Sequence, residues 1–186
     1  MLFHLHSIVA EDPASNKTAF LVTDQNRQTL SDLKFYLARV NGNLDTRKGI
    51  MFNGSVGTGK TLILEMLRRC ILDLWGKQLS IHTAPYIKQQ FYNDPIDGYS
   101  MSYMVQNYRY LGINDIGLEQ TTMKGDEIIR NIIYERFEKR LFTFGTMNLE
   151  LPEFFKRYEY ADDVGRMTDR FKHLFNYVSL NGNSFR

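Results

Sequence analysis

The sequence feature that most constrains this chain is the glycine-rich segment Gly54-Ser-Val-Gly-Thr-Gly-Lys-Thr61. It matches the P-loop pattern G-x-x-x-x-G-K-[ST] at every position. With ordinary amino-acid frequencies, a window of this length matches the pattern by chance about three or four times in 100,000. A short apolar run at 48–52 leads directly into the segment, and apolar residues recur at helical spacing after it. The pattern therefore predicts a strand, a phosphate-binding loop and a helix.

The residues of this loop predict how a nucleoside triphosphate would be held. Glycines let backbone N–H groups turn toward phosphate oxygens at angles that a side chain would block. Lys60 would reach the β- and γ-phosphates, and the hydroxyl of Thr61 would face Mg²⁺. The positive end of the following helix would face the same phosphates. The expected ligand is ATP with Mg²⁺, and the residues expected to bind it are Gly54, Ser55, Val56, Gly57, Thr58, Gly59, Lys60 and Thr61.

Strand-like and helix-like segments alternate along the rest of the chain. Strands are expected at 20–23, 48–52, 79–82, 110–113, 141–144 and 176–180. Helices are expected at 29–40, 62–75, 123–140, 152–157 and 162–173, with two short helices inside 83–108. This alternation predicts an α/β three-layer domain whose mostly parallel sheet is covered on both faces. We expect a single domain over 1–186, in which 1–45 form an N-terminal strand and helix extension and 46–186 form the core.

Composition excludes several classes of protein. The 186 residues carry 23 basic and 21 acidic side chains, so the net charge of +2 argues neither for nor against a nucleic-acid partner. Cys70 is the only cysteine, which excludes an intramolecular disulfide and fits a reducing cytosol. No apolar run approaches the roughly 18 residues of a membrane span, and the N-terminus lacks the pattern of a secretory signal. We therefore expect a cytoplasmic protein with no membrane partner.

A second strand in P-loop NTPases carries an acidic group for magnesium and, in many, a carboxylate that activates water. Here that strand is expected in Leu111-Gly-Ile-Asn-Asp-Ile-Gly-Leu-Glu119. The segment is similar to the acidic-pair segment of AAA+ helicase loaders of the DnaC type and of the related IstB transposition helpers. In that family two adjacent acids precede a hydrophobic residue, a glycine and often a later glutamate. The resemblance covers about residues 47 to 186 and implies an AAA+ P-loop NTPase of the ASCE type.

The sequence departs from this family at the acidic pair. Asn114 stands where the family has its magnesium-binding Asp, Asp115 falls where the water-activating carboxylate is expected, and Glu119 matches the later acid. An asparagine can contact a magnesium-bound water but brings no charge to hold the ion. An Asp in place of Glu draws the base back by one methylene, and small misplacements cost rate. Nucleotide binding through Asn114 and metal binding through Thr61 and Asp115 are expected to survive, while fast hydrolysis is in doubt.

Three more residues take roles from the resemblance alone. Thr146-Met-Asn-Leu149 is similar to the family's T-T-N-L, which gives Asn148 the sensor-1 role beside the γ-phosphate; a turn residue that caps the next helix is the alternative. Arg170 matches an arginine finger that acts on a neighbouring subunit, with Arg166 as the competitor and a surface salt bridge as the alternative. Arg186 matches sensor 2, and the chain ends there, so no separate helical lid domain is expected.

The segment 83–108 occupies the place where related ATPases insert a helical element that meets single-stranded DNA. Its rings and cations could stack on bases and pair with phosphates, although tyrosines at such spacings also occur as half-buried packing residues. The residues concerned are Tyr86, Lys88, Phe91, Tyr92, Tyr99, Tyr103, Tyr108 and Arg109. The run Arg136, Lys139 and Arg140, by contrast, is expected to be a solvated helix face rather than a binding patch.

Together these features predict an ATPase of the helicase-loader type that acts in DNA replication. It would bind ATP and Mg²⁺, associate with copies of itself or with a neighbouring ATPase subunit through Arg170, and contact single-stranded DNA and a replicative helicase. Two alternatives stay open. One is a transposition helper of the IstB type, and the other is an interaction module that binds nucleotide but hydrolyses little of it.

Overall fold

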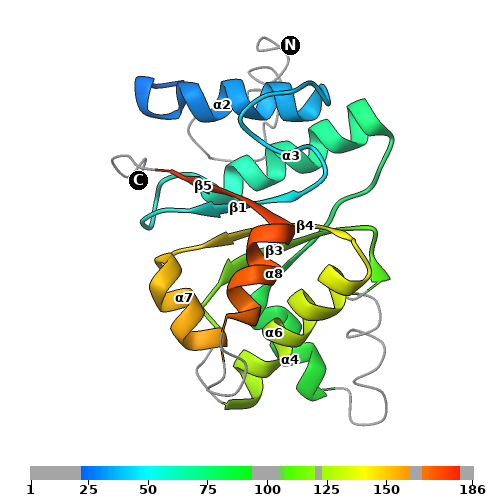
Figure 1. Cartoon of the computed structure of the whole chain (residues 1–186), viewed down its shortest axis with the longest axis vertical. Helices are drawn as coiled ribbons and strands as arrows, with labels where there is room; N and C mark the ends of the chain where they lie inside the picture. The colour runs from blue at the N-terminus through cyan, green and yellow to red at the C-terminus, as the bar shows by residue number, and fades with distance from the viewer. Residues whose placement is uncertain (1–21, 94–104, 106, 120–122, 160–164, 181–186) are drawn as a thin grey trace.

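The computed structural model of the chain describes residues 22–93, 105, 107–119, 123–159 and 165–180. Strands and helices alternate along the described chain, except that α7 and α8 follow one another between β4 and β5 (Figure 1). The strands are β1 (Gly49–Asn53), β2 (Ser80–Thr83), β3 (Tyr110–Ile116), β4 (Phe142–Met147) and β5 (Phe175–Ser179). The helices are α2 (Asp24–Leu37), α3 (Lys60–Trp75), α4 (Ala84–Asn93), α6 (Met123–Glu138), α7 (Leu151–Tyr158) and α8 (Arg166–Leu174).

The strands form one five-stranded sheet in the order β2-β3-β4-β1-β5, and every pairing is parallel. In this register Asn53, the last residue of β1, lies beside Met147 of β4 and Ser179 of β5. All the strands therefore end at one edge of the sheet, here called the carboxyl edge, and begin at the opposite, amino edge. In open parallel sheets the carboxyl edge is where ligands bind.

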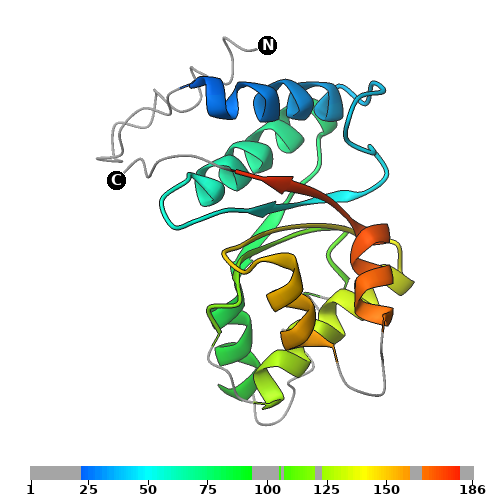
Figure 2. The same cartoon turned by 60° about the vertical axis from the view of Figure 1, so that its left-hand side comes forward.

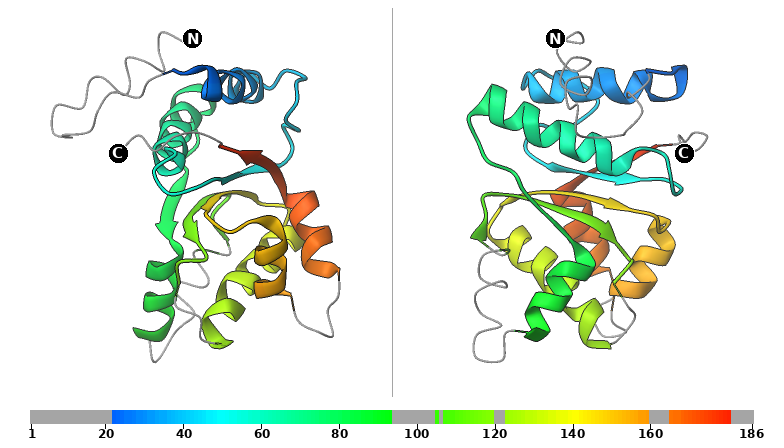
Figure 3. Two further views of the ribbon diagram at one scale, coloured as in Figure 1. Left: turned by 90° about the vertical axis from the view of Figure 1, so that its left-hand side faces the viewer. Right: turned by 180° about the vertical axis from the view of Figure 1, so that it is seen from behind.

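The sheet is the middle of three layers. Helix α3 covers one face with α2 stacked outside it, and α4, α6, α7 and α8 cover the other face (Figures 2 and 3). Alternation along β1 explains how one strand serves both layers: Ile50 and Phe52 pack with α2 and α3, while Met51 packs with the helices opposite. The α/β class, the three layers and the parallel sheet predicted from the sequence are confirmed.

Most predicted elements are present, with shifted ends. Strand β3 runs to Ile116 and so includes the Asn-Asp pair that was expected to follow it. The strand predicted at 20–23 is wrong at Val22 and Thr23, which belong to no strand, while residues 20 and 21 lie outside the described part. Thr23 is instead the N-cap of α2, where its backbone N–H donates to Asn26 Oδ1 at 2.9 Å. A polar cap of this kind favours the start of a helix over a strand.

The prediction of a solvated face at Arg136, Lys139 and Arg140 is wrong for Arg136. Its side chain is fully buried, and its guanidinium donates at 2.7 Å to Thr143 Oγ1, to the carbonyl of Val105 and to the carbonyl of Phe142. Burial lowers the pKa of Arg136 to about 9, which leaves it charged at neutral pH. Arg136 therefore ties α6 to β4 and to the chain that enters β3. Within the described residues, no helix has the length and apolarity needed to span a bilayer.

Candidate nucleotide-binding site

The glycine-rich loop joins β1 to α3 at the carboxyl edge. Gly54, Gly57 and Gly59 have φ values of 155°, 89° and 83°, which place them in the region that side chains rarely adopt. At Gly54 a side chain would also clash with a neighbour, because a Cβ there would lie 2.4 Å from the carbonyl oxygen of Leu180. Gly59 caps α3 directly, so the first N–H groups of that helix open onto the loop. This backbone has the form of a phosphate cradle.

Lys60 folds over the loop. Its ammonium donates to the carbonyls of Gly54 and Ser55, each at 2.7 Å, and the side chain is buried. Burial lowers the pKa of Lys60, and the negative charge of Asp115 opposes that shift. The ammonium is thus held by carbonyl dipoles and one nearby carboxylate. Phosphate oxygens would be stronger partners for it, since they carry full charge.

A β-bulge shapes the end of β3. The register against β4 slips between Ile113 and Ile116, and Asp115 has a φ of 59°, in the left-handed region. Neighbouring side chains of a regular strand point to opposite faces, but the bulge lets those of Asn114 and Asp115 meet. Asn114 Nδ2 donates to Asp115 Oδ2 at 2.8 Å. Sequence reasoning missed this bulge, although Asn and Asp are the residues that most often adopt such a conformation after glycine.

Asn114 stands at the centre of a closed hydrogen-bond network. Its Oδ1 accepts from Thr61 Oγ1 at 3.1 Å and from Thr146 Oγ1 at 2.8 Å. Thr146 Oγ1 in turn accepts from the backbone N–H of Asp115 at 2.8 Å. Every polar atom of the Asn114 amide group therefore has a protein partner. The network brings together Thr61, Asn114 and Asp115, three residues that the sequence assigned to nucleotide and metal binding, and Thr146 is a member that the sequence did not identify.

These residues fit ATP with Mg²⁺ on chemical grounds. The hydroxyl of Thr61 and the oxygens of Asn114 and Asp115 are the hard donors that Mg²⁺ prefers. Among the described residues, no group of three or more His, Cys, Asp and Glu side chains could hold a metal by itself. Mg²⁺ is usually bound through one or two carboxylates together with phosphate oxygens. Asp115 could supply the single carboxylate, and the nucleotide would supply the rest.

Asn148 lies at the same edge, immediately after β4 and so between the ends of β1 and β3. The chain around it is fixed on both sides. Before it, Met147 is fully buried and paired in the sheet with Asn53 and Ile116. After it, the carbonyl of Leu149 accepts a short hydrogen bond from Asn53 Nδ2. Asn53 is buried and was not identified from the sequence.

Beyond β3, Glu119 is tied to α7. Its side chain is fully buried; Oε2 accepts from the backbone N–H of Gly117 at 2.8 Å, and Oε1 accepts from the hydroxyl of Tyr158. Arg157 donates at 2.6 Å to the carbonyls of both Gly117 and Glu119. Burial raises the pKa of Glu119, while its hydrogen bond from Tyr158 lowers it. Sequence reasoning matched Glu119 to a family position but gave no sign of its partners on α7.

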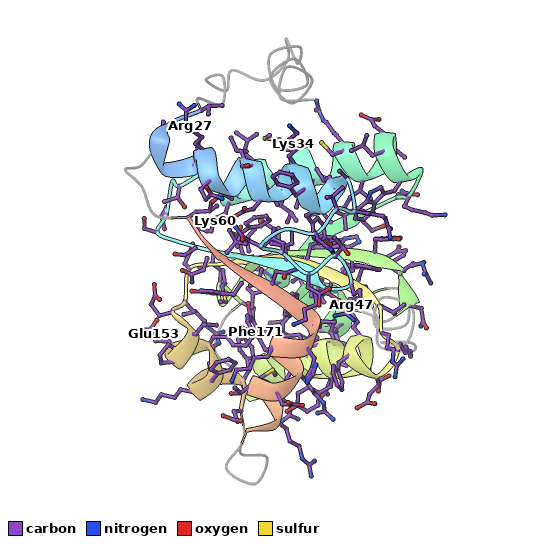
Figure 4. All side chains as sticks on the ribbon, turned by 45° about the horizontal axis from the view of Figure 1, so that its top comes forward. Arg27, Lys34, Arg47, Lys60, Glu153 and Phe171 are labelled. Carbon is purple, nitrogen blue, oxygen red and sulfur yellow. The ribbon has the colours of Figure 1, made fainter. Side chains whose placement is uncertain are left out.

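Arg170 lies at the other edge. It belongs to α8, which leads into β5, and the first residue of β5 is paired with Gly49 at the start of β1. The guanidinium of Arg170 stacks 3.7 Å from the ring centroid of Tyr134 and donates to Glu138 at 3.2 Å. Figure 4 labels Lys60 and Arg47 near the two ends of β1 and so shows how far these edges are separated. The structure does not bring Arg170 to the P-loop of its own chain.

Of the segment 83–108, the structure describes 83–93, 105, 107 and 108. The rings of Tyr86, Phe91 and Tyr92 are exposed on α4. His82 of β2 stacks between Tyr86 and Tyr108, with centroids 5.9 and 6.2 Å away. Tyr99 and Tyr103 lie outside the described residues, as does Arg186, the predicted sensor 2.

The fold is similar to those of solved replication proteins. The DnaC helicase loader superposes with a TM-score of 0.72 at 18% identity, covering 87% of this chain and 93% of that one. DnaI superposes with a TM-score of 0.68 at 20% identity, covering 90% and 87%. DnaA from Aquifex aeolicus, bound to AMPPCP, gives 0.65 at 17% identity; this chain spans only 50% of its length. No protein-family model and no curated protein matches the sequence. At such identities the likeness establishes the AAA+ P-loop fold.

Proposed function

We propose that this chain, which has the AAA+ fold of the helicase loaders, binds ATP with Mg²⁺ and acts in DNA replication as a loader-like ATPase. The observation that carries the proposal is the meeting of Lys60, Thr61 and Asp115 at the carboxyl edge. Thr61 and Asp115 are both joined to Asn114 by hydrogen bonds, and the charge of Asp115 acts on Lys60. One cation, one hydroxyl and one carboxylate around a glycine cradle are the parts that bind a metal-bound triphosphate.

Each residue has a role in this proposal. Lys60 exchanges its two loop carbonyls for phosphate oxygens, and the backbone N–H groups of the loop bind the remaining oxygens. ATP with Mg²⁺ supplies the phosphoryl group and neutralises its charge. Asp115 orients water, and Asn148 places its amide beside the γ-phosphate. Arg170, which lies at the amino edge, would serve the nucleotide of a neighbouring chain.

Slow hydrolysis is part of the proposal, because the acidic pair is incomplete. Asp115 is the one carboxylate of the Asn114 network, so metal binding and water activation compete for it. Asn114 is neutral and is already bonded to two hydroxyls and to Asp115. This supports a second candidate function, in which the chain is an interaction module. Such a module would bind ATP, hydrolyse little of it, and interact with its partner in a nucleotide-dependent way.

Single-stranded DNA is the proposed macromolecular partner. A DnaA structure with a TM-score of 0.66 and 18% identity to this chain is bound to AMPPCP and single-stranded DNA. The exposed rings of Tyr86, Phe91 and Tyr92 on α4 support a similar partner here, because aromatic faces stack on bases without reading sequence. The replicative helicase is proposed on the loader-like fold alone.

ATP turnover and nucleotide affinity would test the first part. We expect the unmodified chain to bind a fluorescent ATP analogue at micromolar concentration and to hydrolyse ATP slowly. Asn114→Asp restores a second carboxylate, so we expect turnover to rise about tenfold, provided that the hydrogen bond to Asp115 is replaced without loss of fold. Fast turnover by the unmodified chain would overturn the argument from Asn114, and absence of nucleotide binding would overturn the proposed function.

Single-stranded DNA binding would test the second part. Fluorescence anisotropy of a labelled oligonucleotide, with and without ATP, should show binding that weakens as salt rises. Replacing both Phe91 and Tyr92 with alanine should weaken it by about 30-fold or more, since stacking contributes roughly 1–3 kcal/mol per base and two rings are lost. Leu72→Ala, at an exposed apolar position on α3, is the matched control. No binding at low salt would favour the interaction module.

A further inference from the structure

The loop that follows β3 is clamped to α7 by the buried Glu119 and Tyr158 and the partly buried Arg157, here together called the α7 clamp. Four hydrogen bonds converge on it. Glu119 accepts from Gly117 N–H and from the Tyr158 hydroxyl, and Arg157 donates to two carbonyls of the loop. A buried carboxylate is costly unless its charge is paired and hydrogen-bonded. The chain thus keeps a charged group in its interior at a place where no ligand is expected.

The clamp fixes Gly117, and Gly117 is in close contact with Leu149. Gly117 has a φ of 99°, and a Cβ built on it would lie 2.7 and 2.9 Å from the Cδ1 and Cγ atoms of Leu149. The leucine side chain therefore rests directly on the glycine backbone. Any shift of the loop would displace Leu149, because close-packed interiors transmit such shifts.

Leu149 in turn follows Asn148, the residue proposed to sit beside the γ-phosphate. The carbonyl of Leu149 is bonded to Asn53, the last residue before the P-loop. Asn148 is thus held from two directions, by the end of β1 through Asn53 and by the clamped loop through Gly117. Both contacts are made by Leu149, the residue next to Asn148.

We propose that Glu119, Arg157 and Tyr158 are positioning residues that set Asn148 against the γ-phosphate by clamping Gly117 under Leu149. This rests on the proposed function, since it concerns the recognition of a third phosphate. The hydrogen bonds of the clamp go to the loop after β3 and not to the P-loop, so we expect the clamp to act on the distinction between ATP and ADP more than on nucleotide affinity in general. In this proposal the loop after β3, α7 and the chain after β4 together position Asn148 for the distinction between ATP and ADP.

Tyr158→Phe is the least disruptive test, because it removes one hydroxyl and keeps a ring packed against Phe154. We expect its affinity for a fluorescent ATP analogue to fall about fivefold while its affinity for the ADP analogue stays within twofold. Tyr36→Phe is the matched control: Tyr36 is equally buried, and its hydroxyl donates to the carbonyl of Lys48 at the amino edge. That variant should leave the ratio of the two affinities unchanged.

A double-mutant cycle separates positioning from general loss of stability. In an Asn148→Ala background, Tyr158→Phe should have no further effect on the ratio of ATP to ADP affinity, since the residue through which it acts is gone. Equal losses for both nucleotides, or an additive effect in the double variant, would overturn the proposal.

Hydrogen exchange gives a readout that does not depend on nucleotide. In Tyr158→Phe, amides of 115–119 and of 147–150 should both exchange about tenfold faster, whereas amides of α3 should not change. Faster exchange confined to 115–119 would overturn the clamp even in a chain that binds ATP well. Failure of the unmodified chain to bind any nucleotide would count against the proposed function, while the exchange result would still decide whether the clamp reaches Asn148.

Discussion

At the carboxyl edge of the sheet the polar side chains are bonded to one another and to the glycine-rich loop. At the amino edge the cationic side chains are bonded to the strands and helices themselves. Lys60 and Asn114 are bonded to loop carbonyls, hydroxyls and one carboxylate, all within a bent backbone. Arg136 and Arg170 are bonded to strand carbonyls, a glutamate and an aromatic ring within regular helices. The first set can exchange its partners for those of a ligand, while the second cannot do so without loosening helices.

The difference between the edges shows which part of the proposed catalytic arrangement one copy of the chain does not bring to its own nucleotide. Among the described residues, one edge holds the groups expected to bind a triphosphate, and the other holds the arginine expected to act on it. Arg170 begins from a stacked position on Tyr134, 3.7 Å from the ring centroid, so a partner chain would have to draw it away from its own helix pair. A single copy is half of the proposed catalytic arrangement.

The largest effect is expected from Arg136, on stability. Arg136→Ala removes three hydrogen bonds and leaves a cavity between α6 and β4, so we expect a loss of about 3–5 kcal/mol in the free energy of unfolding. Denaturant unfolding followed by circular dichroism measures this loss. Lys139→Ala, at an exposed position three residues further along and just after α6, should change the free energy of unfolding by under about 0.5 kcal/mol. Equal losses for both variants would contradict the assignment of Arg136 to the core.

Lys60→Ala should affect binding instead of folding. We expect the affinity for a fluorescent ATP analogue to fall about 100-fold, or roughly 2.7 kcal/mol, because the charged partner of the phosphates is gone. The free energy of unfolding should stay within about 1 kcal/mol, since the ammonium bonds only to its own loop. Lys34→Ala, on α2, serves as the control for lost charge. A large loss of stability in Lys60→Ala would remove the contrast between the two edges.

Arg170→Ala should leave the affinity for ATP unchanged and lower ATP turnover by about tenfold. This is well below the roughly 10³–10⁵ that an arginine finger contributes elsewhere, because Asp115 stands without a second carboxylate. An equimolar mixture of the Lys60→Ala and Arg170→Ala chains should recover part of the turnover, since each supplies the edge that the other lacks. Arg166→Ala tests the competing arginine on the same helix. Loss of ATP affinity in Arg170→Ala would place that arginine at its own nucleotide instead.

The sequence was sufficient where structure is local. Apolar runs and helical spacing located β1 and α3 to within two residues, because a buried parallel strand and an amphipathic helix leave periodic patterns. The glycine pattern also located the loop between them. The β-branched pair Val22 and Thr23 was misleading, since a capping residue decides the start of α2 more strongly than strand propensity does.

What the sequence could not reveal depends on contacts between distant segments. The burial of Arg136 requires carbonyls from Val105 and Phe142, and nothing in a helix pattern separates a buried arginine from a solvated one. The bonds that Glu119 makes to α7 come from Arg157 and Tyr158, which lie 38 and 39 residues further along the chain. The meeting of Asn114 with Thr146 likewise depends on a bulge in β3 and on its neighbour in the sheet.

The smallest effect is expected from the pH dependence of the buried Glu119. Burial raises its pKa above the usual 4.5, so the folded chain keeps a proton that the unfolded chain releases at the same pH. Stability from this group is therefore complete below pH 4.5 and is lost as pH rises through the raised pKa. Glu119→Gln lacks this titration, so the stability of the unmodified chain relative to the variant should fall as pH rises from 4 to 7. We expect the change to stay under about 1.5 kcal/mol, because hydrogen bonds from Tyr158, from the backbone of Glu119 and from the backbone of Gly117 offset much of the cost of burial.

Denaturant unfolding of both proteins at several pH values measures this difference. If the relative stability of the unmodified chain rose with pH instead, the donors would outweigh burial and the pKa of Glu119 would lie below its usual value. The clamp would then stabilise the carboxylate as a fixed part of the fold, and the contrast between the edges would be confined to the P-loop and the Asn114 network.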